Sequence, residues 1–256
     1  MRMLETRGLT KHFKGLRALN NIALRVGANE IVGVIGPNGS GKTTLFNLIT
    51  GFLKPTSGEV VFEGKHITSK GPHAIAELGI ARTFQMDRLF HEFTVLQNVA
   101  VASRLYSRIG FWEAVFSLPD YRTKYKNTWD YALKILQFVG LDDKKDEIAR
   151  NLSHGHQKML GVAIALSANP KLLLLDEPCA GMNPKELNLA LELIGKIRER
   201  GISVVLIEHN MKAVMNVCSR IVVLNFGTEI ANGSPDEVQK NEDVIQAYLG
   251  VTGSAA

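Results

Sequence analysis

Residues 36–44 read G-P-N-G-S-G-K-T-T, and this stretch decides the fold. It fits the pattern G-x-x-x-x-G-K-[ST], with Lys42 and Thr43 at the last two fixed positions. The apolar run I-V-G-V-I at residues 31–35 precedes it, and the helix-compatible run T-L-F-N-L-I at residues 44–49 follows it. Strand, glycine-rich loop and helix, in that order, are the context in which this pattern binds nucleotide phosphates, whereas a chance glycine turn requires no such flanks.

The composition of this loop suits a phosphate. A phosphate group needs several aligned N–H donors, and a loop without side-chain obstruction can wrap them around it. The helix that follows adds its positive N-terminal end. Lys42 supplies a point charge to the β- and γ-phosphates, and the Thr43 hydroxyl is placed for Mg²⁺. We therefore expect ATP and Mg²⁺ here, and the residues expected to contact ATP are Gly36, Pro37, Asn38, Gly39, Ser40, Gly41, Lys42, Thr43 and Thr44.

An acidic pair follows a second apolar run. Residues 171–175 read K-L-L-L-L and lead directly into Asp176 and Glu177. A buried strand would carry Asp176 to the edge where the metal is expected, and Glu177 could then reach a water in line with the γ-phosphate. Proton removal by a placed carboxylate contributes about 10²–10⁴-fold to the rate. An acidic pair alone is a weak signal, but together with the phosphate loop it predicts a site that hydrolyses ATP.

The composition is that of an ordinary globular protein. The chain has 256 residues, of which 45% are hydrophobic and 21% charged, enough for a sizeable core. No apolar run approaches the roughly 18 residues of a membrane span, and the first residues lack a signal-peptide core. Two cysteines fit a reducing compartment. The net charge of +5 is scattered, which favours a solvated surface over a nucleic-acid patch, so we expect a cytosolic protein that could sit against a membrane protein.

The α/β pattern is interrupted once, by a helical and aromatic-rich stretch. Within that stretch we expect helices over residues 94–106, with Thr94 as the cap, and over 110–117 and 121–139. Near the N-terminus we expect an antiparallel β piece, with Phe13 in a polar loop between two strands. The predicted organisation is a single nucleotide-binding domain over residues 1–251, with an α/β core (1–85 and 152–234), an inserted helical subdomain (86–151), C-terminal helices (235–251) and a disordered tail (252–256).

Residues 151–157 read N-L-S-H-G-H-Q. Here the chain resembles the ATP-binding subunits of ABC transporters, whose signature is L-S-G-G-Q, and the resemblance covers nearly the whole chain. It implies a P-loop NTPase core of the ABC type, in which Phe13 stacks on the adenine. It also implies that Ser153 and Gly155 contact the γ-phosphate held by the opposite subunit. The catalytic residues that it implies are Glu177, His209, Gln85 and Lys42, and the Mg²⁺ ligands are Thr43, Gln85 and Asp176.

The chain departs from the family pattern at three positions. His154 replaces the first glycine of the signature and His156 its glutamine, which leaves the contacts beside Ser153 open. A metal site built on these two histidines is not expected, because no further ligand cluster accompanies them. Asn183 stands where many relatives carry Asp, which leaves a cross-interface bond open as well.

Finer resemblance points to one branch of the family. The stretches G-I-A-R-T-F-Q (79–85), A-G-M-N-P (180–184) and A-Y-L-G (247–250) resemble the larger ATP-binding subunit of branched-chain amino acid importers. That resemblance implies an ATPase subunit that powers import through a membrane permease, by ATP-driven head-to-tail dimerisation and opening on hydrolysis. The dimer would be a homodimer or a heterodimer with a related ATP-binding subunit. A periplasmic-type substrate-binding protein would take part indirectly, and nucleic acid would not. The chain would lie peripherally at the cytoplasmic face of the inner (cell) membrane.

Other functions stay open at this point. The ATPase of lipopolysaccharide export has a similar C-terminal ending and is the nearest alternative. A soluble ABC-type ATPase of DNA repair would carry a long heptad insertion, and one linked to translation would carry two phosphate loops; neither feature is present. A non-hydrolysing nucleotide-binding regulator would lack Lys42 or Glu177, and the chain has both.

Overall fold

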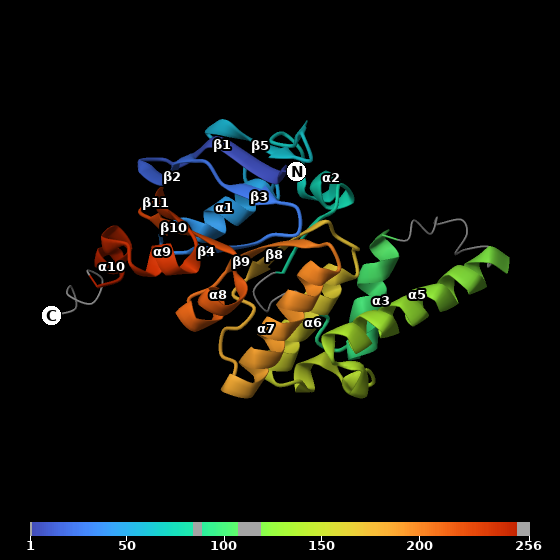
Figure 1. The fold of residues 1–256 in the computed structure, drawn as a ribbon. Helices are drawn as coiled ribbons and strands as arrows, with labels where there is room; N and C mark the ends of the chain where they lie inside the picture. The colour runs from blue at the N-terminus through green and yellow to red at the C-terminus, as the bar shows by residue number, and fades with distance from the viewer. Residues whose placement is uncertain (1, 84–88, 107–118, 250–256) are drawn as a thin grey trace.

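The computed structural model describes residues 2–83, 89–106 and 119–249. A central sheet lies in the middle of the molecule and a second, antiparallel sheet lies beside it (Figure 1). Helices α3 and α5 extend away from the central sheet on one side, and the C-terminal helices α9 and α10 lie on the other side. This mixed α/β architecture agrees with the predicted fold class.

The central sheet positions the site. Its order is β11-β10-β4-β9-β8-β7, and all neighbours pair in parallel except β10 and β11, which form an antiparallel hairpin. Strands β4, β8 and β9 are buried at every residue, which is why their sequences are continuous apolar runs. The carboxyl ends of parallel strands meet at one edge, so the loops after these strands come together there. The strands are β4 (Ile31–Ile35), β7 (Ile80–Arg82), β8 (Leu172–Asp176), β9 (Ser203–Ile207), β10 (Arg220–Asn225) and β11 (Thr228–Gly233).

The antiparallel sheet corrects one prediction. Phe13 does not lie in a loop, because strand β1 continues to Phe13 and pairs it with Leu16 across a tight hairpin. The register of β1 against β2 shifts between Leu9 and Lys11, and this irregularity breaks the alternation by which a strand is recognised. The sheet has the order β2-β1-β5-β6, with β3 paired to β1, and its strands are β1 (Arg2–Phe13), β2 (Leu16–Ile22), β3 (Arg25–Gly27), β5 (Ser57–Phe62) and β6 (Lys65–His66).

The helices begin where capping residues stand. Thr94 precedes α3, accepting a hydrogen bond from the N–H of Gln97 at 3.1 Å while the Gln97 side chain accepts from the N–H of Thr94 at 2.8 Å, so the predicted cap is confirmed. The helix expected over residues 110–117 lies outside the described residues. The described helices are α1 (Lys42–Ile49), α2 (Pro72–Glu77), α3 (Val95–Tyr106), α5 (Pro119–Val139), α6 (His154–Leu166), α7 (Pro184–Glu199), α8 (Met211–Val217), α9 (Pro235–Gln239) and α10 (Glu242–Leu249), with short 3₁₀ turns at Asp142–Lys144 and Ala149–Asn151.

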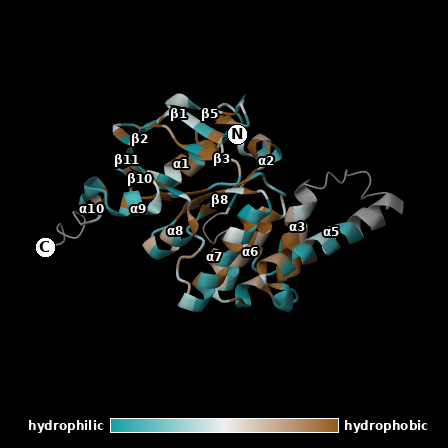
Figure 2. Cartoon of the chain, viewed as in Figure 1, coloured by the Kyte–Doolittle hydropathy of each residue, from teal (hydrophilic) through white to brown (hydrophobic). Residues whose placement is uncertain are grey.

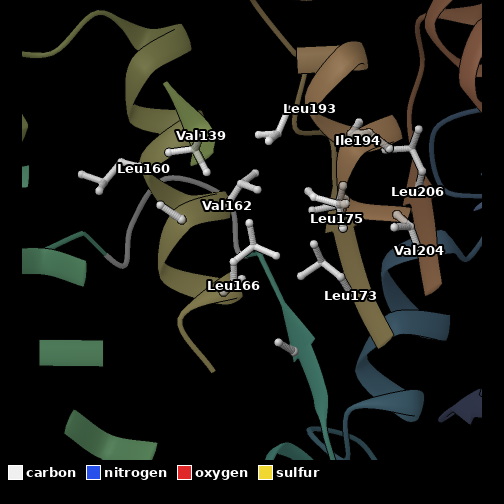
Figure 3. Close-up of a cluster of buried hydrophobic side chains, with 14 of the residues drawn as sticks. Val139, Leu160, Val162, Leu166, Leu173, Leu175, Leu193, Ile194, Val204 and Leu206 are labelled. Atoms are coloured by element: carbon white, nitrogen blue, oxygen red, sulfur yellow. The ribbon is translucent and has the colours of Figure 1, made fainter. Parts of the chain in front are cut away.

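Two apolar clusters cover the two faces of the central sheet. Leu173 and Leu175 of β8 belong to one cluster, and their neighbours Leu172 and Leu174 belong to the other, as the alternation of a strand requires. Figure 3 shows the first cluster, in which side chains of α6 point toward β8. Helices α3 and α5 bury residues in this same cluster, so the helical part shares a core with the sheet. Figure 2 shows hydrophobic residues gathered where α3, α6 and the central strands meet.

Candidate ATP site at the carboxyl edge of the central sheet

The phosphate loop leaves β4 in a conformation that only glycine tolerates at two positions. Gly36 has φ +148° and Gly41 has φ +106°. A Cβ at Gly36 would lie 2.0 Å from the carbonyl oxygen of Leu224, and a Cβ at Gly41 would lie 2.7 Å from that of Ala18. The two fixed glycines of the pattern are therefore required by close backbone contacts as well as by ligand access.

Helix α1 begins with its N–H groups available. Its N-cap is Gly41, no side chain caps it, and no acidic residue stands in its first turn. Thr43 is exposed and Thr44 is half-buried. Such a helix start attracts anions, since its first N–H groups lack intrahelical partners. Pro37, Asn38 and Gly39 form the accessible crest of the loop before it.

Lys42 lies across the phosphate loop. Its ammonium group donates to the carbonyl oxygens of Gly36 and Pro37, both at 2.8 Å. Burial lowers the pKa of Lys42, and the carboxylates of Glu177 and Asp176 oppose that shift. Lys42 therefore stands close enough to both acidic residues to be influenced by their charge, in the grouping that the sequence predicted.

Asp176 is buried at the end of β8 and forms an ion pair that sequence reasoning missed. Its Oδ2 accepts from Nη2 of Arg82 at 2.8 Å, with the two side chains only 4% and 6% exposed. Its other carboxylate oxygen, Oδ1, is buried and has no hydrogen-bond partner in the part of the chain that the structure describes. An unsatisfied carboxylate oxygen is a suitable ligand for a hard cation, so the residues present fit Mg²⁺.

Glu177 and His209 come together, although 32 residues separate them in the sequence. Oε1 of Glu177 lies 2.8 Å from Nε2 of His209, and their side chains are 25% and 41% exposed. Glu177 has φ +51°, an uncommon value for a residue with a side chain, and its carbonyl accepts from the ammonium of Lys158 at 3.2 Å. A partly exposed carboxylate held by a histidine can accept a proton from water.

A buried glutamate that sequence reasoning passed over braces this edge. Glu208 is 2% exposed, and its Oε1 accepts from the N–H of Cys179 at 2.7 Å. It thereby joins the loop after β9 to the loop after β8. Burial raises the pKa of the Cys179 thiol and the Glu208 carboxylate raises it further, so this cysteine stays protonated. In the sequence, Glu208 is only an acidic residue directly before His209, and no neighbouring residue indicates that its partner is Cys179.

The hairpin that carries Phe13 lies against the phosphate loop. Ala18 and Leu19 of β2 are the neighbours that a Cβ at Gly41 would meet. Phe13 itself is 42% exposed, and the ammonium of Lys11 lies 5.1 Å from its ring centroid. An exposed aromatic ring on such a hairpin can stack on a nucleotide base, as the sequence predicted.

The signature stretch lies at the start of α6. Ser153 is the N-cap, and its Oγ accepts from the N–H of His156 at 3.3 Å and lies 3.0 Å from the Nδ1 of that residue. Gly155 is buried so tightly that a Cβ there would lie 2.8 Å from the carboxylate carbon of Glu186. Among the described residues no hydrogen bond joins residues 152–156 to the phosphate loop of the same chain.

Two further residues singled out in the sequence are Gln85 and Asn183. Gln85 lies outside the described residues. Asn183 caps α7, where its side chain accepts from the N–H groups of Lys185 and Glu186, both at 3.0 Å. The Glu186 side chain returns a bond to the N–H of Asn183, which completes a capping box. The residue that departs from the family pattern thus has a structural role inside its own chain.

Tyr248 of α10 is another residue that sequence reasoning did not assign to the site. Burial raises the pKa of Tyr248, and a hydrogen bond with the backbone of Gly36 opposes that shift. Tyr248 and Gly36 line a cavity of about 870 Å³, which His209 and Asn38 also line. The C-terminal helix therefore lies directly against the first residue of the phosphate loop.

Two family models and several curated relatives match the chain. Residues 19–180 match the family model described as "ABC transporter", and residues 229–253 match one described as "Branched-chain amino acid ATP-binding cassette transporter". The chain is 43% identical over 249 residues to the high-affinity branched-chain amino acid transport ATP-binding protein LivG of Salmonella typhimurium, covering 97% of this chain and 98% of that one. It is 42% identical over 249 residues to the high-affinity branched-chain amino acid transport ATP-binding protein BraF of Pseudomonas aeruginosa, again covering 97% of this chain and 98% of that one.

Two solved structures of ATP-binding cassettes superpose on this chain. The ADP conformation of MJ1267, an ATP-binding cassette of an ABC transporter, superposes with a TM-score of 0.86 at 34% identity, covering 98% of this chain and 99% of that chain. The ATP-binding cassette MJ0796, in a dimeric post-hydrolysis state bound to ADP and Pi, superposes with a TM-score of 0.78 at 26% identity, covering 91% and 99%.

Proposed function

We propose that this chain, which belongs to the ATP-binding subunits of ABC transporters, hydrolyses ATP to drive the import of branched-chain amino acids through a membrane permease. The observation that carries the proposal is the contact between Glu177 and His209 at the ends of adjacent strands, within the electrostatic reach of Lys42. The cargo is taken from what the relatives are named for, and the match of the C-terminal segment to the same branch supports it.

The chemistry follows from the positions of the side chains. The N–H groups at the start of α1 and the Lys42 ammonium bind the β- and γ-phosphates. Glu177 accepts a proton from the attacking water, and His209 holds the Glu177 carboxylate in place through Nε2. Mg²⁺, held by Thr43 and Asp176 with Gln85, supplies positive charge to the phosphate oxygens when it is bound.

The site requires a second chain. Ser153 and Gly155 stand at the start of α6, where the unpaired N–H groups of the helix favour an anion, while the Glu186 carboxylate, 3.4 Å from the Ser153 hydroxyl, opposes it. Because no hydrogen bond joins this segment to the phosphate loop within the described residues, we propose that it binds the γ-phosphate of a partner subunit. The partner is a second copy of this chain or a related ATP-binding subunit, arranged head to tail.

An apolar groove between α2, α3 and α6 is the proposed contact with the permease. The groove has a volume of about 530 Å³, and its walls include Phe52, Ile75, Phe90 and Ile164. Phe52 is 43% exposed and Phe90 is 51% exposed, which is unusual for large apolar side chains unless a partner covers them. A cytoplasmic amphipathic helix of the permease fits such a groove. No helix in the described part of the chain is long and apolar enough to cross a bilayer. The proposed place, peripheral at the cytoplasmic face of the membrane, is taken from the relatives, which are named as ATP-binding proteins of transport systems.

The test is ATP-dependent uptake of labelled leucine into proteoliposomes that hold this chain and the permease that co-purifies with it, with the substrate-binding protein of the same system supplied on the side from which leucine is taken up. Glu177→Gln should abolish both hydrolysis and uptake. Lys171→Gln is the matched control. It also removes a charge next to β8, but at the amino end of the strand, where Lys171 pairs with Glu63. It should leave both rates unchanged. Hydrolysis without any leucine uptake would overturn the assignment of the cargo while leaving the ATPase in place.

A further inference from the structure

Two consecutive residues at the end of β7 hold Asp176 from two sides. Arg82 donates through Nη2 to Oδ2 of the carboxylate at 2.8 Å, and the Oγ1 of Thr83 accepts from the backbone N–H of Asp176 at 3.0 Å. The Arg82 and Asp176 side chains are almost completely buried. The orientation of the Asp176 carboxylate is therefore fixed by β7, and the oxygen without a partner among the described residues is Oδ1.

The same guanidinium reaches the helix of the phosphate loop. Nη1 of Arg82 donates to Oδ1 of Asn47 at 2.6 Å, and the guanidinium carbon lies 5.3 Å from the ring centroid of Phe46. Asn47 lies four residues after Thr43 in α1, so the two side chains are on the same face of the helix. Arg82 thus connects the helix face that carries Thr43 to the strand end that carries Asp176.

We propose that Arg82 is a positioning residue for the magnesium site, which sets the spacing of Thr43 and Asp176 and turns Oδ1 of Asp176 toward the metal. The proposal rests on the proposed function, since Thr43 and Asp176 are the metal ligands proposed there. A planar guanidinium suits this task, because its two terminal nitrogens hold two partners in a fixed relative geometry.

The competing effect of Arg82 is electrostatic repulsion of the metal. A guanidinium beside a carboxylate repels an arriving cation, so if repulsion dominated, removing Arg82 would strengthen Mg²⁺ binding. If positioning dominates, removing Arg82 leaves a buried carboxylate uncompensated, and Asp176 turns toward another partner. We expect the second outcome because both residues are buried and Arg82 contacts three residues on two elements, Asp176 of β8 and Phe46 and Asn47 of α1.

The experiment measures ATP affinity by calorimetry twice for each variant, once with excess Mg²⁺ and once in EDTA. The dissociation constant in EDTA divided by the dissociation constant in excess Mg²⁺ reports how much the metal contributes to ATP affinity. For Arg82→Gln we expect this ratio to fall by about tenfold, the usual size for loss of a group that orients a metal ligand, with affinity in EDTA nearly unchanged. Arg82→Lys should give an intermediate ratio, since an ammonium keeps the charge without the planar fork.

Arg220→Gln is the control for general destabilisation. Arg220 also pairs with a carboxylate, Glu30, at 2.8 Å and also donates to an asparagine, Asn232, but it lies at the amino end of β10. Its loss should lower the unfolding temperature without changing the ratio. If Arg82→Gln does not fold, Asn47→Ala decides, because it removes the hydrogen bond from Arg82 to α1 without removing a charge, and it should also lower the ratio.

An unchanged or higher ratio in Arg82→Gln, or an unchanged ratio in Asn47→Ala when only that variant folds, overturns the inference. A wild-type protein whose ATP affinity does not depend on Mg²⁺ overturns instead the metal site of the proposed function. Electron paramagnetic resonance of Mn²⁺ added with ATP gives a second readout that does not depend on turnover, and Arg82→Gln should broaden or weaken the bound signal while Arg220→Gln leaves it intact.

Discussion

Phe13 carries the residue-scale prediction for nucleotide binding. Its ring is 42% exposed at the end of β1, on the hairpin that packs on the phosphate loop. Stacking of a base on an aromatic ring contributes roughly 1–3 kcal/mol, so Phe13→Ala should weaken ATP binding at least several-fold. The dependence on Mg²⁺ should not change, because the ring contacts no phosphate group.

Leu16→Ala is the matched control for Phe13→Ala. Leu16 pairs with Phe13 across the hairpin and is 69% exposed, so it is an apolar side chain on the same turn. Titration of a fluorescent ATP analogue should show lower affinity in Phe13→Ala alone. Equal ATP affinities in both variants and the wild type would show that Phe13 does not stack on the base and has only a structural role.

Residues within a motif could be predicted, whereas their partners could not. The fixed spacing of the phosphate loop identified Lys42, and the strand that ends in an acidic pair identified Glu177. Arg82 and Glu208 were missed, since each acts through a residue far away in the sequence: Asp176 lies 94 residues from Arg82, and Cys179 lies 29 residues from Glu208. Such contacts depend on strand order, which no local pattern encodes.

At the scale of elements, α10 is the part of the chain whose contact with the site gives a prediction. The Tyr248 hydroxyl lies beside the backbone of Gly36, which opposes the rise that burial causes in the pKa of the tyrosine, at the point where β4 enters the phosphate loop. Tyr248→Phe removes this polar contact, and we expect a loss of at most about 1 kcal/mol in the free energy of unfolding, the size typical of one hydrogen bond. ATP binding should weaken as well, because Gly36 begins the loop.

Urea unfolding and ATP titration of Tyr248→Phe provide the measurement. Ile245→Ser is the control on the same helix, since Ile245 is 42% exposed and does not line the cavity beside the phosphate loop. If Ile245→Ser lowers ATP affinity as much as Tyr248→Phe does, the effect belongs to the helix as a whole and not to the tyrosine hydroxyl.

The elements themselves were predictable to different degrees. Helix starts with a capping side chain or proline were found close to their true positions, as at Thr94 and Pro235, because the cap is a local interaction. The continuation of β1 to Phe13 was not found, since the irregular pairing with β2 disturbs its alternation. The pairing of β4 with β9 and β10 joins residues far apart in the sequence and became visible only in the structure.

At the scale of the whole molecule, the groups proposed to bind phosphate form two separate sets in one chain. One set is the phosphate loop with Glu177 and His209, and the other is Ser153 with the start of α6. If each set completes the other in a second chain, then ATP itself holds the two chains together, and hydrolysis releases them. The association of the chains should therefore depend on ATP and on the persistence of its γ-phosphate.

Glu177→Gln tests this directly, because the amide keeps the size of the side chain but cannot accept the proton of the attacking water. Analytical ultracentrifugation should show a monomer in ADP and a stable dimer in ATP. Adding Ser153→Asp should abolish the dimer without weakening ATP binding to the phosphate loop of the single chain. Aspartate still caps α6, so the helix is kept, while its carboxylate repels the γ-phosphate of the partner. A dimer that persists in the double variant, or turnover by Glu177→Gln at the parental rate, would contradict the shared site.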